Sequence, residues 1–313
     1  MKTQNRGPLS GIKVLDLGRV LSGPYCGMML ADMGADVIKL EMPETGDDSR
    51  YYGPFHEGAS AYFSSVNRNK RSITLNLKSE SGREIFLKLA EKSDVILENF
   101  RPGTMKKLGL DYEQVKKVNP KIIYASISGF GQTGPFAGRA AYDGIVQAMG
   151  GIMSITGEKG GKPVKVGTSV GDIIAGMFCA YGIVAAYVSL QKTGKGQYID
   201  VAMLDSQIAI LENAIVKYTV AGIIPRPNGN THTSIFPFET FETETEDIMI
   251  AAGNNNLWQK LCHVIGRDEL GTDPRFATNP DRDRNHDEMF SIVNDRLKTR
   301  GCDEWSLMLD EVG

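Results

Sequence analysis

The sequence predicts an α/β protein, with a doubly wound, Rossmann-like parallel sheet in a large domain and a small α+β domain after it. Three observations predict this fold class. Short β-rich runs alternate with helical runs in the first half of the chain, a proline and glycine cluster follows, and the pattern then changes to that of antiparallel strands. The composition of the 313 residues, 41% hydrophobic and 23% charged, is that of a soluble globular protein.

The predicted sheet is built from five β-rich runs. These are GIKVLDLG, ADVIKLE, DVILENF, KIIYASISGF and QYIDVAML, at residues 11–18, 35–41, 94–100, 121–130 and 197–204. A helical period of 3.6 residues marks GREIFLKLAEKS and YEQVKKVNP between the later strands. Strands that alternate with helices form parallel sheets with both faces covered. The large domain is therefore predicted over residues 1–206.

The chain leaves this sheet through a predicted long helix at 205–222, which ends where IIPRPNGN supplies a proline and glycine cluster. Residues 207–226 are thus a connecting helix and linker, and residues 227–313 form the small domain. Its pattern predicts antiparallel strands in FPFETFETETEDIMIAAG, then helices on either side of a charged loop, DRDRNHDE. No closing element follows DEWSLMLDEVG, so we expect a chain that is cut short.

The uncharged run from Ile173 to Leu190 is long enough to span a membrane. Glycines, alanines, a serine and two tyrosines dilute it, so we interpret it as a helix buried on all sides within the large domain. The net charge of −3 argues against a nucleic-acid or membrane-surface protein, and the N-terminus has no secretory signal. A cytoplasmic protein is expected.

Side chains that bind metals or act as nucleophiles are scattered. The four cysteines form no C-x-x-C pair, so neither a zinc site nor a disulfide framework is predicted. The four histidines are also dispersed. His263 lies on an apolar helical pattern and is predicted to be a core residue, whereas His286 lies in a charge run and is predicted to be solvated.

Two turns at strand ends are candidates for ligand binding. VLDLGRVLSGPYCG follows the first strand, but its glycines lack the G-x-G-x-x-G spacing, so a nicotinamide cofactor is not expected even though Glu41 is placed as a ribose-binding acid. ENFRPG follows a later strand at its carboxyl end, where open sheets bind ligands. There Arg101, Lys106 and Lys107 are candidates for phosphate binding.

Asp172, in VGDIIAG, comes just before the uncharged run, and the residues alone leave its role open. As an N-cap it would stabilise the helix by about 0.5–2 kcal/mol over alanine, and the local sequence favours this interpretation. As a reagent it would be an ionised carboxylate with its pKa lowered by the helix dipole, and Gly171 would leave room for a substrate carbonyl.

Several collinear segments together resemble the class III CoA-transferases, the family of formyl-CoA transferase and carnitine CoA-transferase, whose relatives include α-methylacyl-CoA racemase. They run from PLSGIKVLDLGRVLSGP through GADVIKLE, NKRSITLNLK, ENFRPG, ISGFGQTGP and AYDGIVQAMGG to VGDIIAG and TGKGQYIDVAM, with GNNNLWQKL and DPRFATN in the small domain. The resemblance implies an interlocked homodimer that binds coenzyme A as acyl-CoA and needs no metal. It makes Asp172 the expected catalytic nucleophile and so overrides the N-cap interpretation.

The resemblance also implies which residues hold the substrates. The implied CoA-binding residues are Val20, Leu21 and Ser22 in the first turn, Leu75, Asn76 and Lys78 near the adenine, and Asn99, Arg101 and Lys107 toward the rest of the nucleotide end. A family arginine after the second strand is Met42 here, so its phosphate contact is either missing or taken over by Arg50. Tyr142 and Gly171 are expected at the substrate. The glycine-rich lid of the formyl-CoA enzymes has no counterpart, which argues against an oxalate-type substrate.

The implied reaction moves CoA from an acyl-CoA donor to a carboxylate acceptor through an aspartyl anhydride and an aspartyl-CoA thioester, with backbone N–H groups around Gly171 stabilising the oxyanion. Two alternatives stay open. A racemase or epimerase of the same fold needs two proton carriers, but Tyr142 stands where that branch has a histidine, and Asp143 is predicted to be a structural hydrogen-bond acceptor. An inactive CoA-binding remnant would fit the short C-terminus.

Overall fold

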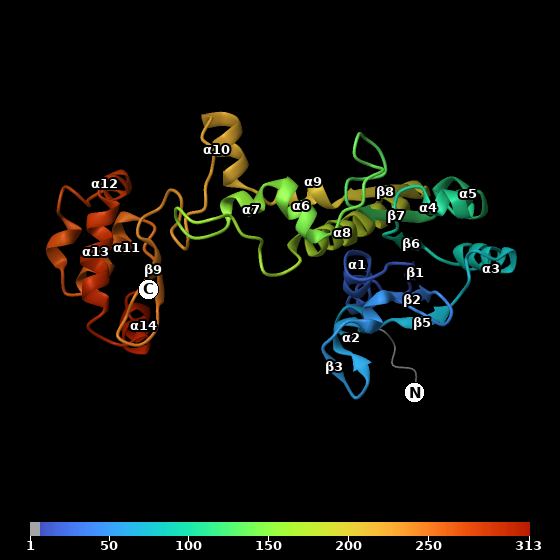
Figure 1. Cartoon of the computed structure of the whole chain (residues 1–313), viewed down its shortest axis with the longest axis horizontal. Helices are drawn as coiled ribbons and strands as arrows, with labels where there is room; N and C mark the ends of the chain where they lie inside the picture. The colour runs from blue at the N-terminus through green and yellow to red at the C-terminus, as the bar shows by residue number, and fades with distance from the viewer. Residues whose placement is uncertain (1–6) are drawn as a thin grey trace. The chain divides into compact units, whose positions relative to one another are not determined.

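The computed structural model describes residues 7–313, which divide into two compact units (Figure 1). Unit 1 contains the described residues up to Ser154 together with Val164–Pro225, and unit 2 contains Ile155–Pro163 and Arg226–Gly313. The short segment Ile155–Pro163 therefore belongs to the smaller unit although it precedes the long apolar helix in sequence. This assignment depends on contacts with residues that are distant in the sequence, so the local sequence pattern could not predict it.

A six-stranded, fully parallel sheet forms the centre of unit 1. Its strands are β1 (Lys13–Asp16), β2 (Asp36–Glu41), β5 (Arg71–Thr74), β6 (Val95–Glu98), β7 (Ile123–Ser128) and β8 (Gln197–Ala202), in the order β5-β2-β1-β6-β7-β8. The predicted doubly wound fold is confirmed, and β5 is an additional strand that the sequence did not predict. The strand order reverses between β1 and β6, and open α/β sheets bind ligands at such a reversal.

Alternating side chains of the strands build a core on each face of this sheet. Val14 and Val95 lie in one hydrophobic cluster, whereas the neighbouring residues Leu15 and Ile96 lie in the other. The covering elements of unit 1 are α1 (Ser22–Asp32), α2 (Ala61–Asn67), α3 (Glu80–Ala90), α4 (Thr104–Leu108), α5 (Tyr112–Val118), α6 (Asp143–Gly150), α8 (Val170–Thr193), α9 (Met203–Ala209) and α10 (Asn213–Ala221). A 3-10 turn (Asp48–Tyr51), the small hairpin β3–β4 (Phe55–His56 and Ala59–Ser60) and the single turn α7 (Ile152–Ile155) complete the elements up to α10.

Helix α8 has the length and composition of a membrane span, but within unit 1 it packs against α1, α9, β7 and β8. Cys179 and Ile183 on its inner side are buried in the core. Phe178 and Tyr181 on another side are exposed, Tyr181 by 74%. The prediction of a helix buried on all sides is therefore wrong for this chain, because the sheet and α1 cover only part of its circumference.

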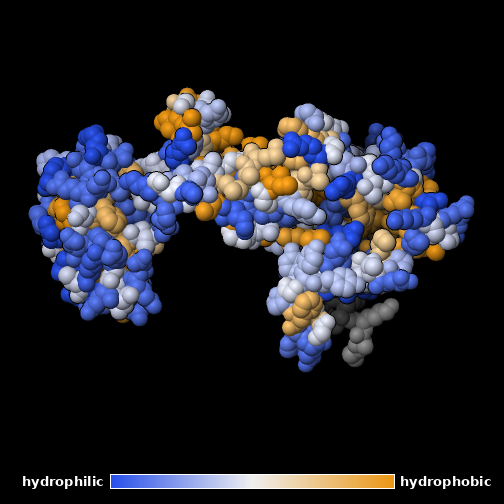
Figure 2. All heavy atoms as spheres, viewed as in Figure 1, coloured by the Kyte–Doolittle hydropathy of each residue, from blue (hydrophilic) through white to orange (hydrophobic). Residues whose placement is uncertain are grey.

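The helix predicted at 205–222 is two helices, α9 and α10. They are separated near Glu212, whose φ of +48° is incompatible with a continuous right-handed helix. Helix α10 exposes Val216, Tyr218 and Val220, and hydrophobic atoms gather over it in Figure 2.

Unit 2 is a small α+β fold with its own core around Trp258 and Trp305, both fully buried. Its elements are the antiparallel pair β9 (Phe238–Phe241) and β10 (Ile248–Ala251) and the helices α11 (Asn255–Val264), α12 (Asn279–Arg284), α13 (His286–Leu297) and α14 (Cys302–Asp310), with a 3-10 turn at Asp268–Gly271. The predicted charged loop at 281–288 is instead the end of α12 and the start of α13. Thr278 and Asp281 form a capping box that begins α12, and the high density of charged residues had favoured the prediction of a loop instead.

The predicted environments of His263 and His286 are both wrong: His263 is exposed, and His286 is mostly buried. His263 is exposed and pairs with Asp268, because it lies on the outer face of α11. His286 has a side chain only 16% exposed, and its Nε2 lies 2.9 Å from a carboxylate oxygen of the buried Glu239. The ion pair with Glu239 raises the pKa of His286 above its ordinary value.

This pair predicts a pH-dependent stability of unit 2. Because the folded-state pKa of His286 is raised, its stabilising contribution is fully present below the unfolded pKa of about 6.5 and is lost as pH rises through the folded value. We expect the thermal unfolding of unit 2, followed by tryptophan fluorescence, to move to lower temperature above neutral pH. His286→Gln should weaken that dependence, and an unchanged pH dependence in this variant would contradict the assignment.

Candidate active site

Two adjoining cavities open at the carboxyl ends of the strands, around the reversal between β1 and β6. The first has a volume of about 270 Å³ and is called the leucine cavity, because Leu17, Leu40, Leu75, Leu77 and Leu108 line it. Its other lining residues are Gly18, Arg19, Lys39, Glu41, Met42, Gly46, Asp47, Asn76, Lys78, Phe100 and Thr104. The second, of about 420 Å³, is named the Asp172 cavity; it includes Val20, Leu21, Ser22, Asn99, Arg101, Arg139, Tyr142 and Asp172. Arg19, Phe100 and Thr104 line both, so the two cavities form one continuous site.

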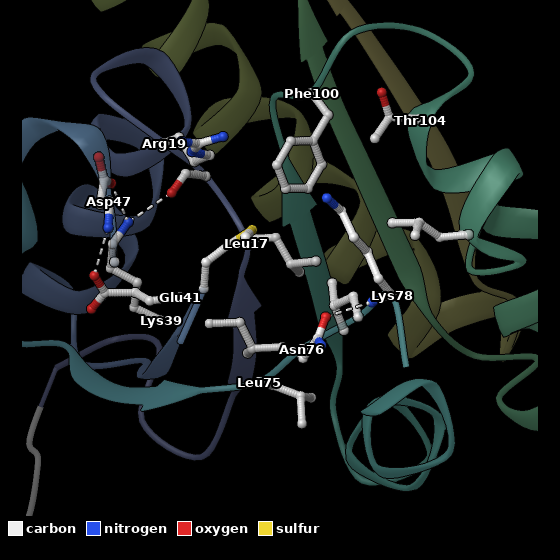
Figure 3. A pocket seen from close by; sticks show the side chains of 16 residues that line it. Leu17, Arg19, Lys39, Glu41, Asp47, Leu75, Asn76, Lys78, Phe100 and Thr104 are labelled. Carbon is white, nitrogen blue, oxygen red and sulfur yellow. Dashed lines mark hydrogen bonds and ion pairs between the residues drawn. The ribbon is translucent and has the colours of Figure 1, made fainter. Parts of the chain in front are cut away.

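The leucine cavity is an apolar slot with cations beside it. Leu75, Asn76 and Lys78, which the resemblance assigned to adenine binding, all line it just after β5. Figure 3 shows the Phe100 ring and the Lys78 side chain pointing toward one another. Asn76 Oδ1 accepts a 3.0 Å hydrogen bond from the Lys78 N–H, which sets the turn that presents both residues. A flat aromatic group with anionic substituents suits such a lining.

The turn between β1 and α1 forms the wall between the cavities. Val20 has a φ of +65°, which is a strained conformation for a β-branched residue and one that needs support from its surroundings. Asn99 supplies part of that support, because its side chain accepts from the Arg19 N–H at 2.8 Å and donates to the Ser22 hydroxyl at 3.1 Å. The Val20 N–H donates to Asp47. Asn99 thus holds the turn as well as lining the site.

Two buried ion pairs also stabilise the turn between β1 and α1. Lys70 Nζ lies 2.8 Å from Asp16 Oδ2, and Lys39 Nζ lies 2.8 Å from Asp47, with all four side chains at most 2% exposed. Asp16 accepts from the Gly18 N–H, and Lys39 donates to the Gly18 carbonyl. Both peptide groups of Gly18 are therefore fixed by side chains that are themselves paired with opposite charges.

Asp172 lies in the first turn of α8 but is not its N-cap, which is Ser169. The hydroxyl and the backbone N–H of Ser22, the first residue of α1, lie near the Asp172 carboxylate and favour its charged form. Burial, with repulsion from Asp143, raises the pKa of Asp172 to about 6, so the expected lowering by the helix dipole is outweighed.

Gly171 faces α6 and does not line either cavity. A Cβ atom at this position would lie 2.6 Å from a methyl group of Val146, so glycine is required by the close approach of α6 to α8. The Gly171 N–H donates to Asp143 Oδ1 at 2.9 Å, and Asp143 Oδ2 accepts from Gln147. The expected roles of Gly171 at the substrate and in the oxyanion site are therefore corrected, and Asp143 is the structural acceptor that was predicted.

The predicted cations separate into two groups. Arg101 lines the Asp172 cavity, as does Tyr142. Lys107 and Arg50 line neither cavity. The guanidinium of Arg50 makes two 2.7 Å hydrogen bonds to the buried carboxylate of Glu41, so the expected phosphate contact would require breaking this pair. Burial disfavours the Glu41 charge, but bonds from Arg50 and Ser72 outweigh it and lower the pKa of Glu41 to about 2.

Arg19, Phe100 and Arg139 are among the lining residues that the sequence did not predict. Arg19 and Phe100 lie beside predicted residues, in turns at the carboxyl ends of β1 and β6, and that position could have indicated them. Arg139 lies in the loop between β7 and α6, and only the tertiary structure brings it to Asp172. Among the described residues, no three His, Cys, Asp or Glu side chains come together as a metal site.

Comparison with known proteins gives concordant matches along the chain. Residues 9–313 match the family model described as CoA-transferase family III. The chain is 46% identical to acetyl-CoA:oxalate CoA-transferase of Acetobacter aceti, covering 98% of this chain and 79% of that protein. It is 46% identical to succinate–glutarate CoA-transferase of Agrobacterium fabrum, covering 92% and 74%. It is 40% identical to human succinyl-CoA:glutarate CoA-transferase, covering 99% and 71%.

Solved structures agree with these matches. A CaiB/BaiF family protein from Brucella suis superposes with a TM-score of 0.87 at 43% identity, covering 98% of this chain and 82% of that one. The hypothetical protein Rv3272 from Mycobacterium tuberculosis superposes with a TM-score of 0.88 at 32% identity, covering 99% and 83%.

Proposed function

The chain belongs to CoA-transferase family III, and on that premise we propose that Asp172 carries CoA between an acyl-CoA donor and a carboxylic acid through covalent intermediates. The observation that carries this proposal is the position of Asp172, half-buried in the wall of a cavity that continues into an apolar slot with cations beside it. Such a site accommodates a long ligand with a nucleotide at one end and a reactive group at the other.

Acyl-CoA fits this site in one direction. Its adenine is proposed to occupy the leucine cavity beside Leu75 and Asn76, with the pantetheine arm running along the turn Val20–Ser22. Lys78 and Arg101 are the cations of the lining that we propose for the phosphates. This direction places the thioester beside Asp172, because Ser22 and Asp172 line the same cavity.

The proposed reaction balances without any added proton carrier. An Asp172 carboxylate oxygen attacks the thioester carbonyl carbon, the C–S bond breaks, and a mixed anhydride and the CoA thiolate form. The thiolate then attacks the aspartyl carbonyl carbon, which gives an aspartyl-CoA thioester and releases the donor acid as its carboxylate. The acceptor carboxylate repeats both steps in reverse and restores the Asp172 carboxylate.

The tetrahedral oxyanion needs donors other than the Gly171 N–H, which is bonded to Asp143. Ser22 is the proposed source, because its N–H lies in the first turn of α1, where backbone N–H groups have no partner inside the helix. The Ser22 groups that favour the charged form of Asp172 in the resting state would then stabilise the developing negative charge.

The names of the relatives point to the acceptor class. The enzymes from Acetobacter, Agrobacterium and human are named for oxalate, succinate and glutarate, which are small dicarboxylic acids. We propose that the acceptor of the present chain is also a small dicarboxylic acid. The homodimer implied by the resemblance remains a proposal, tested by the mass in solution.

The pKa of Asp172 predicts the pH dependence of the reaction. A nucleophilic carboxylate must be ionised, so kcat/KM should fall as pH decreases through about 6. Repulsion from Asp143 is one cause of that raised pKa, so Asp143→Asn should move the acid limb to lower pH. Rate profiles between pH 4.5 and 8 measure this, and an acid limb that stays in place would contradict the assignment to Asp172.

A racemase remains the second candidate, and one structural observation counts against it. Asp143, one potential proton carrier, accepts hydrogen bonds from Gly171 and Gln147 and does not line the Asp172 cavity. Incorporation of deuterium at the α-carbon of an acyl-CoA in heavy water would restore this candidate. Binding of CoA without any exchange would instead indicate an inactive remnant.

The test of the transferase proposal is the intact mass of the protein after incubation with acetyl-CoA or succinyl-CoA. An acyl or CoA adduct on the peptide that contains Asp172, absent from Asp172→Asn, is the expected result. Acyl transfer to an acid without any such adduct, or an adduct on another residue, would reject covalent catalysis at Asp172.

A further inference from the structure

The Asp172 cavity contains more positive charge than its own acids neutralise. Its charged lining residues are Arg19, Asp48, Arg101, Arg139 and Asp172. Arg19 forms a 2.6 Å ion pair with Asp48. Within residues 7–313, neither Arg101 nor Arg139 forms an ion pair. Once Asp172 is converted to a neutral thioester, both guanidinium charges are left without a compensating acid in the cavity.

Aromatic rings, and not an acid, hold Arg139. Its guanidinium carbon lies 5.0 Å from the centre of the Phe136 ring and 5.9 Å from that of Phe130. The two rings pack edge to face at 5.7 Å. Cation–π packing orients a guanidinium while leaving its charge and its N–H edge available for an anion. Arg139 is thus prearranged for a carboxylate.

A short segment connects Arg139 to a residue that bonds the neighbour of Asp172. Only three residues separate Arg139 from Asp143, whose carboxylate bonds the N–H of Gly171, the residue next to Asp172. Tyr142, on the same short segment, also lines the cavity. The loop that carries Arg139 is therefore tied directly to the first turn of α8.

We propose that Arg139 forms a subsite for the second carboxylate of a dicarboxylic acid, whose first carboxylate reacts at Asp172. This inference rests on the proposed function and assigns its acceptor specificity to one residue of this chain. Arg101 is the less suitable candidate, because it follows Asn99 and Phe100 on the side of the cavity proposed for the nucleotide end. A guanidinium pairs with a carboxylate in a planar, two-bonded geometry that a thioester or a methyl group cannot reproduce.

The test compares two acceptors of equal length, succinate and butyrate, with acetyl-CoA as donor. For Arg139→Gln we expect KM for succinate to rise about 10- to 100-fold, the range for loss of one charge-assisted hydrogen bond, with a much smaller change in kcat. KM for butyrate should stay close to that of the wild type. Arg139→Lys, which keeps the charge but loses the planar fork, should recover part of the affinity for succinate.

Arg101→Gln is the matched control, because it removes a second unpaired arginine from the same cavity. It should raise KM for acetyl-CoA and leave the ratio of the succinate and butyrate KM values unchanged. An Arg139→Gln variant that affects both acids equally, or neither, overturns the subsite. Failure of the wild type to transfer CoA to any acid overturns the proposed function itself, which is a distinct outcome.

Discussion

Replacement of Asp172 by asparagine is expected to reduce kcat for CoA transfer by roughly 10³-fold or more, the scale seen when the nucleophile of a covalent mechanism is removed. Asparagine has nearly the same shape and still offers an oxygen to the Ser22 donors, but it is not an anionic nucleophile at neutral pH. Steady-state rates at saturating acyl-CoA measure the loss. Binding of CoA, followed by calorimetry, should be retained because no proposed CoA contact has changed.

The stability of the same variant separates chemistry from folding. Burial and Asp143 raise the pKa of Asp172, so the ionised carboxylate destabilises the folded protein above the unfolded pKa of about 3.9, and increasingly so up to the folded value near 6. Asp172→Asn should therefore unfold at a temperature equal to or above that of the wild type at pH 8. A variant that is both inactive and less stable would not support the assignment.

Replacement of Lys70 by methionine is expected to destabilise unit 1 by about 3–5 kcal/mol, because it leaves the carboxylate of Asp16 buried without its cation. Lys70 also donates to the Pro24 carbonyl and to Asn67, so α1 and α2 lose a common anchor. Urea unfolding followed by far-UV circular dichroism measures the change. Both tryptophans lie in unit 2, so their fluorescence follows that unit separately.

The neighbouring Arg71 supplies the control for that experiment. It pairs with Asp36 at 2.7 Å, but both side chains are about half exposed or more, and such surface pairs contribute about 0–1 kcal/mol. Arg71→Met should therefore have little effect. Equal destabilisation by Lys70→Met and Arg71→Met would show that burial of the Asp16–Lys70 pair is not the cause. The double variant Asp16→Asn with Lys70→Met should recover part of the lost stability.

Much of the fold could be predicted because its signals are local. Alternation of side chains across β1, β6 and β7 and the helical period of α3 and α5 are properties of short segments, and they define a parallel α/β sheet. Strand β5 and the break between α9 and α10 were missed. The exposed residues of β5 lack the apolar alternation of a strand, and the break depends on one backbone conformation at Glu212.

The residues of the candidate site also divide into those that the sequence could predict and those that it could not. Val20–Ser22, Leu75, Asn76, Asn99 and Arg101 lie in turns at the carboxyl ends of strands, and the structure brings them to one continuous site. Arg50 and Lys107 are cations of the right kind near the right turns, yet both lie outside the lining. Whether a cation is available depends on its partner, and the partner of Arg50 is Glu41.

By itself the sequence determined the family and the parallel sheet, because collinear motifs and short-range periodicity can be recognised without knowledge of the packing. The tertiary structure decided the rest. It placed Asp172 in the wall of a cavity with Ser22, bonded Gly171 to Asp143, and left the charge of Arg139 without an acid. These features depend on contacts between residues that are far apart in the sequence. Only the tertiary packing determines which of them come within contact distance.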